Sequence, residues 1–129
     1  MDELDARLHR IGRHPFRAKF RLSGRERGMV EQRGMGTIRE HAAELIGRRL
    51  APAQPRNDGR QTPYRGHPVF VAQHATATCC RTCLNKWHGI SAGRELEHDE
   101  RAYVVEAICR WIIHQCRTEV PRQEGRHKQ

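Results

Sequence analysis

The chain has 129 residues and carries 24 Lys or Arg against 15 Asp or Glu, which gives a formal net charge of +9. This length fits one domain of ordinary size. No apolar run approaches the ~18 residues that cross a bilayer, and the first ten residues alternate charge with leucine. These features argue against a membrane-spanning protein and a secretory signal, so we expect a cytoplasmic protein.

The five cysteines narrow the class of protein further. Their odd number and the expected reducing compartment argue against a disulfide framework. Apolar residues make up 36% of the chain and aromatic residues 5%, so the core must rest on aliphatic side chains. A bound metal would help such a core to fold. We therefore expect the cysteines to be metal ligands, reactive thiols or core residues.

The N-terminal part of the chain is strongly basic. Residues 1–12 are expected to be a flexible segment. Seven cationic residues crowd around the single acid Glu26: Arg10, Arg13, Arg17, Lys19, Arg21, Arg25 and Arg27. Guanidinium groups suit phosphate, so nucleic acid or another acidic partner fits this stretch. The alternative is a charged surface that serves solubility alone, because no nucleic-acid-reading motif accompanies the charge.

Two helices are predicted before residue 51. Ser23 and Glu26 fit a capping box, and Gly34 can end the short helix that follows. Thr37 can cap a second, clearer helix. Its apolar residues recur at helical spacing: Ile38, Ala42, Leu45, Ile46 and Leu50. This spacing predicts a helix with one buried face.

Residues 51–66 change in character. Three prolines and an Asn-Asp-Gly turn exclude regular structure over most of this length: Pro52, Pro55, Pro63 and residues 57–59. A connector this long inside one domain is commonly functional, so it can cover the Cys/His region that follows. A plain surface excursion is the alternative.

Three further helices are predicted after this connector. One begins at Pro68 and runs to about Ala75, and Thr78 can cap a second that ends near His88. Asp99 opens the longest, whose apolar face holds Val104, Val105, Ile108, Trp111, Ile112 and Cys116. The prediction is an all-α bundle of four to five helices over residues 13–117, with a flexible basic tail over 118–129.

Four Cys and His side chains within residues 67–88 suggest a metal site. Cys80-x2-Cys83-x4-His88 has the first three ligand spacings of a zinc knuckle, but Gly93 stands where that pattern has its last cysteine. Cysteines three apart on a helix lie on one face and can share an ion. Thiolate and imidazole ligands suit tetrahedral zinc.

The fourth ligand must come from elsewhere in the chain. We predict His74, at the end of the preceding helix, with Cys79 and His67 as substitutes. Four protein ligands would make the site structural, whereas three with an open position would make it catalytic. Clustered thiolates also hold iron–sulfur clusters, which stays an alternative to zinc.

Two other interpretations of these cysteines remain open. A thiol in the first turn of a helix is readily ionised, so Cys79 or Cys80 can pair with a histidine base in a thiol enzyme. The thiols can also be ordinary core residues. Cys109 and Cys116 are predicted to be core residues, since both fall on the apolar face of the last helix.

The string GHPVFVAQHATATCCR over residues 66–81, followed by Cys83-Leu84 and Lys86-Trp87-His88, resembles a known family. It is similar to the small bacterial proteins grouped as domain of unknown function 4186, from about Phe16 to Trp111. The resemblance implies a small, cytoplasmic bacterial protein. It carries no established activity, substrate or catalytic residue to these positions.

The function that the sequence favours is a zinc-binding helical module that engages an acidic partner such as nucleic acid. His74, Cys80, Cys83 and His88 are the expected ligands. One alternative is an enzyme, either a metal-dependent hydrolase or a Cys–His thiol catalyst. Another is a helical interaction protein without metal. The sequence sets neither the substrate nor the oligomeric state.

Overall fold

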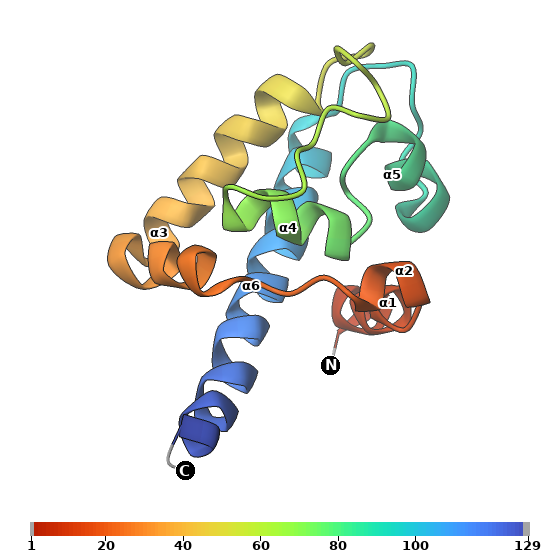
Figure 1. Cartoon of the computed structure of the whole chain (residues 1–129). Coiled ribbons are helices and arrows are strands. Elements are labelled where there is room, and N and C mark those ends of the chain that lie inside the picture. The colour runs from red at the N-terminus through yellow and green to blue at the C-terminus, as the bar shows by residue number, and fades with distance from the viewer. Residues whose placement is uncertain (1, 128–129) are drawn as a thin grey trace.

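The computed structural model describes the backbone of residues 2–127 and the side chains of residues 2–117. These residues form six helices and no strand, so the predicted all-α class is confirmed. The helices are α1 (Glu3–Gly12), α2 (Pro15–Ala18), α3 (Gly24–Arg49), α4 (Pro68–Ala75), α5 (Arg81–His88) and α6 (His98–His127). Figure 1 shows α3 and α6 as the two long elements, with the short α4 in front of α6.

The core lies where α3, α4 and α6 meet. The aliphatic residues that predicted the helix after Thr37 are part of it, and Ile38, Ala42, Ile46 and Leu50 are fully buried. The face of α6 contributes Val104, Ile108 and Ile112, among others. Cys109 lies in the same core and Cys116 packs against it, as predicted for both. Burial of this aliphatic surface is the main source of stability in such a small fold.

Helix α3 is broken at the predicted stop. Gly34 has φ 82° and ψ 155°, which is non-helical, yet the helix resumes directly and runs to Arg49. The predicted capping box at its start is present: Ser23 Oγ accepts from Glu26 N at 3.1 Å, and Glu26 Oε1 accepts from Ser23 N at 2.8 Å. Glycine at the break is expected, because a side chain is strained at positive φ.

Helix α1 lies where we expected a flexible segment, and this is a correction to the predicted domain boundary. Asp2 caps the helix by accepting from Asp5 N at 2.9 Å. Arg110 of α6 donates to both carboxylates, at 2.9 Å to Asp2 and 3.0 Å to Asp5. Ile11 is buried. These contacts order the segment through a residue about a hundred positions away, which no local pattern shows.

The predicted helix over residues 68–75 is confirmed as α4, but the helix after it begins later than expected. Thr78 does not cap α5, because its hydroxyl pairs with that of Thr76 at 3.0 Å inside the protein. Ala77 takes a left-handed conformation (φ 60°), and the chain turns before the helix starts. Cys80 is the residue that caps α5, with its Sγ accepting from Cys83 N at 3.4 Å.

The connector between α3 and α4 has no regular structure, as predicted, and lies against the Cys/His region. Thr62 donates from Oγ1 to the carbonyl of Cys79 at 2.7 Å. Arg81, which is fully buried, holds the start of the connector by hydrogen bonds. Its guanidinium donates to the carbonyls of Leu50 at 3.3 Å, Pro52 at 2.9 Å and Ser91 at 2.7 Å. The connector is therefore a packed part of the domain.

Two further findings concern membrane-spanning helices and the C-terminal tail. In the described part of the chain, no helix has both the length and the apolar character needed to cross a membrane. The predicted flexible basic tail over residues 118–129 lies outside the residues whose side chains are described.

Candidate metal centre

The candidate site is formed by the end of α4 and the turn that leads to α5, and every residue from 71 to 80 is buried. Gln73 stabilises the turn through two contacts with Thr78: its side-chain amide donates to the Thr78 carbonyl at 3.0 Å, and its own carbonyl accepts from Thr78 N at 2.8 Å. This hydrogen bonding fixes the backbone that leads into α5. The result is that Cys79 lies in a buried, hydrogen-bonded turn and Cys80 caps the helix that follows.

Three thiols meet at this point. The sulfur atoms of Cys79, Cys80 and Cys83 all lie within 4.8 Å of one another. Cys79 and Cys80 are buried and Cys83 is half-buried. A tetrahedral zinc ion with sulfur ligands at about 2.3 Å needs its sulfur atoms roughly 3.8 Å apart. Small side-chain rotations therefore suffice to bring the three sulfurs onto one ion.

Arg17 of α2 is the residue that the sequence did not associate with this site. It is 7% exposed, and its Nη2 lies 3.1 Å from Cys83 Sγ. Its Nη1 donates to the carbonyl of His74 at 2.8 Å and lies 3.7 Å from Cys79 Sγ. In the sequence Arg17 is one of seven basic residues in a run, and nothing in its spacing marks it. Its position arises from the packing of α2 against α1 and α4.

The three thiols differ in pKa. Hydrogen bonds from the Cys79 and Cys80 thiols, and then from Arg17, lower the pKa of Cys83 to about 2. Hydrogen bonding to Cys80 and Cys83, together with burial, raises the pKa of Cys79. The Cys79 thiol lowers the pKa of Cys80, but donation to Cys83 and burial outweigh it and raise the pKa. Cys83 is therefore the thiolate of the group, next to a cation.

The predicted ligand set is brought together only in part. Cys80 and Cys83 are in the three-sulfur group, and the third member is Cys79, which we had named as a substitute. His74 is buried near the thiols, but its Nε2 contacts the carbonyl of Thr62 at 3.1 Å. Its ring stacks on Tyr64 with 4.2 Å between ring centres. This histidine is not part of the sulfur group.

His88 is buried at the end of α5 and uses both ring nitrogens. Nε2 contacts the carbonyl of Thr76 at 2.8 Å, and Nδ1 contacts the hydroxyl of Tyr103 at 2.8 Å. Because a carbonyl only accepts, Nε2 carries the proton and Tyr103 donates to Nδ1. Burial lowers the pKa of His88, which keeps this neutral form. His88 thus ties the site to α6 and stands apart from the sulfur group.

His67, the second substitute, is engaged elsewhere as well. Its Nδ1 accepts from Val69 N at 3.0 Å and so caps α4. Its Nε2 lies 3.0 Å from His41 Nδ1 on α3. His67 therefore joins α3 to α4 and does not reach the thiols.

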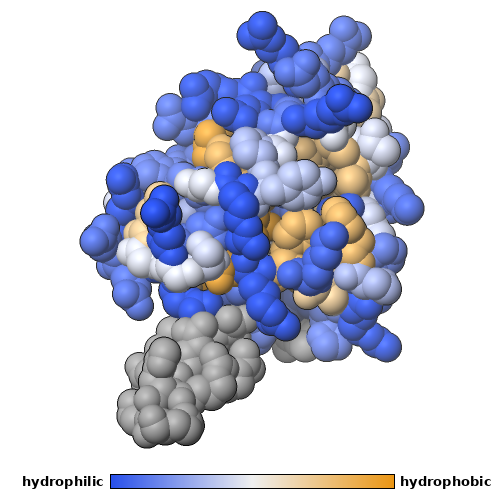
Figure 2. Space-filling model, viewed as in Figure 1, coloured by the Kyte–Doolittle hydropathy of each residue, from blue (hydrophilic) through white to orange (hydrophobic). Residues whose placement is uncertain are grey.

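The basic segment 10–27 divides into buried and exposed residues. Arg17 and Arg27 are buried, whereas Arg10, Arg13, Lys19, Arg21 and Arg25 are exposed. Figure 2 shows apolar side chains around α2 and the end of α4, surrounded by hydrophilic ones. The large apolar residues exposed in the described chain include Phe16 and Tyr64, and the Lys19 amine lies 4.5 Å from the centre of the Phe16 ring. Cations and aromatic rings thus share one surface.

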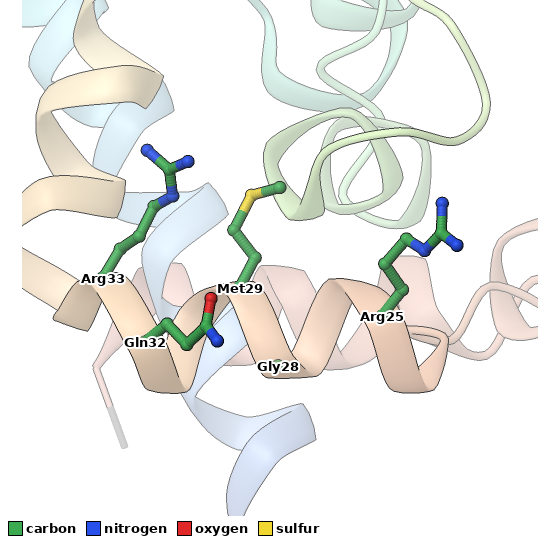
Figure 3. Close-up of a pocket in the computed structure, with 5 residues that line it drawn as sticks. All are labelled: Arg25, Gly28, Met29, Gln32 and Arg33. Atoms are coloured by element: carbon green, nitrogen blue, oxygen red, sulfur yellow. The ribbon is translucent and has the colours of Figure 1, made fainter.

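A shallow pocket on the first half of α3 continues the basic surface. Arg25, Gly28, Met29, Gln32 and Arg33 line it. Figure 3 shows that Arg25, Met29 and Arg33 leave the helix on the same side. Their spacing of four residues produces this, since such residues lie on one helix face. Two guanidinium groups therefore flank a thioether at the surface.

These observations define an all-α domain with a buried three-cysteine cluster that is compatible with metal binding. The model of the DUF4186 family, described as a domain of unknown function, matches residues 5–113. The chain therefore belongs to this family, as the resemblance implied. The matched region begins within α1, eight residues before Arg13. No solved structure matches the chain.

Proposed function

We propose that the protein is a zinc-binding helical module in which Cys79, Cys80 and Cys83 supply the metal ligands. The observation that carries this proposal is the mutual approach of their three sulfur atoms within 4.8 Å. Zinc suits thiolate ligands, and a reducing cytoplasm, which we include in the proposal, keeps them available. The metal would tie the turn before α5 to its first helical turn.

Arg17 supports a thiolate–metal centre for a separate reason. Three thiolates around one divalent ion leave a net negative charge, and burying it without a partner is costly. The guanidinium beside Cys79 and Cys83 offsets that charge and donates to sulfur. Three uncharged thiols would leave this buried guanidinium with a carbonyl acceptor, at His74, but with no negative charge beside it to offset its own.

We propose a structural or partner-binding role for this centre in preference to hydrolysis. Three anionic ligands donate charge to the ion, which weakens its ability to polarise a bound water. Three protein ligands leave one tetrahedral position for water or for a group from a partner. His74 is one candidate for that position, and it must first give up its contact with Thr62.

The test is the metal content of untagged protein purified under reducing conditions. We expect about one equivalent of zinc, and replacing zinc by Co²⁺ should give sulfur-to-metal charge-transfer absorption of the intensity expected for three thiolates. Cys83→Ser should lose the metal. Cys116→Ser is the matched control, because Cys116 is also half-buried but lies outside the group, and it should keep the metal. Stably folded, metal-free reduced protein contradicts the proposal.

The second part of the proposal is an acidic partner, with nucleic acid as the first candidate. It is supported by the exposed cations of the basic segment, the aromatic rings beside them and the two arginines on α3. Phosphates pair with guanidinium groups and bases stack on exposed rings. Oligonucleotide binding should weaken as salt rises.

The burial of each arginine decides which ones a variant that tests this partner should replace. Charge reversal must spare Arg17 and Arg27, since both are buried and their loss would disturb the fold. Arg13→Glu, Arg21→Glu and Arg25→Glu together should abolish salt-sensitive binding of a single-stranded oligonucleotide. The control is reversal of the exposed Arg48 and Arg56, outside that segment. Equal loss in both variants indicates a net-charge effect and contradicts this surface.

A further inference from the structure

The three thiols differ in how accessible they are. Cys79 and Cys80 are 8% and 7% exposed, whereas Cys83 is half-buried. Cys80 caps α5 and Cys83 lies three residues later, in the first turn of that helix. The two sulfurs are within 4.8 Å of each other, and Cys80 Sγ accepts from Cys83 N at 3.4 Å. Cys83 is therefore a partly accessible thiol with a buried thiol directly beside it.

The surroundings of Cys83 suit a nucleophilic sulfur. Arg17 donates to it at 3.1 Å, and the start of a helix presents N–H groups that favour negative charge. A Cys-x-x-Cys pair at a helix N-terminus is an arrangement that exchanges readily with disulfides. A purely structural ligand set has no need for one thiol to be reachable from solvent.

We propose that Cys83 and Cys80 form a redox-active dithiol that exchanges with small-molecule disulfides. The Cys83 thiolate attacks one sulfur of a disulfide R–S–S–R, which forms Cys83–S–S–R and releases RS⁻. The Cys80 sulfur then attacks Cys83 Sγ, its proton passes to solvent, and a second RS⁻ leaves. The protein ends with a Cys80–Cys83 disulfide, and one small disulfide has been reduced to two thiols.

Cys80 is assigned as the resolving residue on geometry. Its sulfur is held next to Cys83 by the capping hydrogen bond. Cys79 lies in the turn before the helix, with its carbonyl bonded to Thr62. The proposal uses the same sulfurs as the metal site but does not depend on metal. Where zinc is bound by all three thiolates, formation of the disulfide would release it.

The experiment uses the reduced full-length chain and glutathione disulfide as the probe. Any zinc is first removed with a chelator, and modified cysteines are located by mass spectrometry after alkylation. We expect Cys83 to react ~100-fold faster than Cys116, which is also half-buried but lies outside the three-sulfur group. The wild type and Cys79→Ser should both end with a disulfide between residues 80 and 83. Cys80→Ser should stop at the Cys83–glutathione mixed disulfide.

Two outcomes contradict the proposal: Cys83 reacts no faster than Cys116, or the Cys80→Ser variant forms a disulfide as fast as the wild type does. Circular dichroism of each variant checks that the helices are retained. The metal proposal fails separately. Reduced protein that exchanges as described but carries no zinc overturns the metal centre and keeps the dithiol. Protein that holds zinc but whose Cys83 reacts no faster than Cys116 overturns the dithiol and keeps the metal centre.

Discussion

Arg17 Nη2 lies 3.1 Å from Cys83 Sγ and joins α2 to the first turn of α5 across 66 residues of sequence. The same guanidinium donates to the carbonyl of His74, so one buried side chain contacts α4, α5 and the turn between them. The sequence shows Arg17 only as one charge of a basic segment. In the fold its side chain is buried and contacts Cys79 and Cys83.

Replacing Arg17 should weaken zinc binding without changing its stoichiometry. Arg17→Met keeps much of the buried stem but removes the cation and its donors to sulfur, so we expect affinity to fall about 10- to 100-fold. Competition with a chromophoric chelator under reducing conditions measures this. Arg13→Met removes an exposed arginine nearby and should bind zinc as the wild type does. Equal affinities in the two variants would show that Arg17 does not act on the site.

His88, one of the two predicted histidine ligands, should be needed for stability and not for zinc binding. His88 bridges the Thr76 carbonyl and the Tyr103 hydroxyl inside the protein, so His88→Gln should lower the free energy of unfolding by about 1–3 kcal/mol. Its zinc content should stay at the wild-type level, measured by mass spectrometry of the metal. Tyr103→Phe removes one of these hydrogen bonds and should cost less. Loss of zinc in His88→Gln would return this histidine to the ligand set.

The sequence predicted the parts of the fold that depend on local pattern. The spacing of Ile38, Ala42 and Ile46 identified the buried face of α3, and Ser23 with Glu26 identified its start. Helix α1 was missed because its order comes from ion pairs with Arg110 on the far side of the chain. Ten residues carry too little helix propensity to reveal such packing.

The sequence predicted two of the three cysteines at the candidate site but not the positions of the histidines. Cys80 and Cys83 follow a spacing that brings them together in a helical turn, and the structure does so. The histidines could not be placed, because the carbonyls of Thr62 and Thr76 that engage them belong to the connector and to a turn. Cys79 joins the group because Cys80, and not Thr78, caps α5, while the Thr78 hydroxyl pairs with that of Thr76.

His67 should make the protein less stable in mild acid. Burial and the neighbouring His41 and Arg33 lower the pKa of His67 from 6.5 to about 4, with Glu26 opposing them. The unfolded chain therefore binds a proton that the folded chain does not, and stability falls as the pH drops from 6.5 towards 4. His67→Asn keeps an oxygen to cap α4 but does not titrate. Chemical denaturation at several pH values should show a smaller acid loss for this variant, though His74 and His88 leave part of it. An unchanged pH dependence contradicts the assignment.

Arg81 should be needed for stability although no carboxylate forms an ion pair with it in the described chain. It is fully buried and donates to three carbonyls, of Leu50, Pro52 and Ser91. Arg81→Met leaves those acceptors without a donor, so we expect a loss of about 3 kcal/mol in unfolding free energy. Arg48→Met, at an exposed position of α3, should change it by less than about 0.5 kcal/mol. A small effect at both positions would mean that water replaces the guanidinium.

The break in α3 gives a prediction in which two neighbouring glycines respond oppositely. Gly34 has φ 82°, where a side chain is strained, so Gly34→Ala should lower stability by about 1–2 kcal/mol. Gly36 is helical and exposed, and a Cβ built there meets no atom within 4 Å in the described structure. Gly36→Ala should therefore raise stability by about 0.5–1 kcal/mol, because alanine loses less backbone entropy on folding. Thermal unfolding of both variants measures the difference. If Gly34→Ala also stabilises the protein, residue 34 is helical in solution and α3 is continuous.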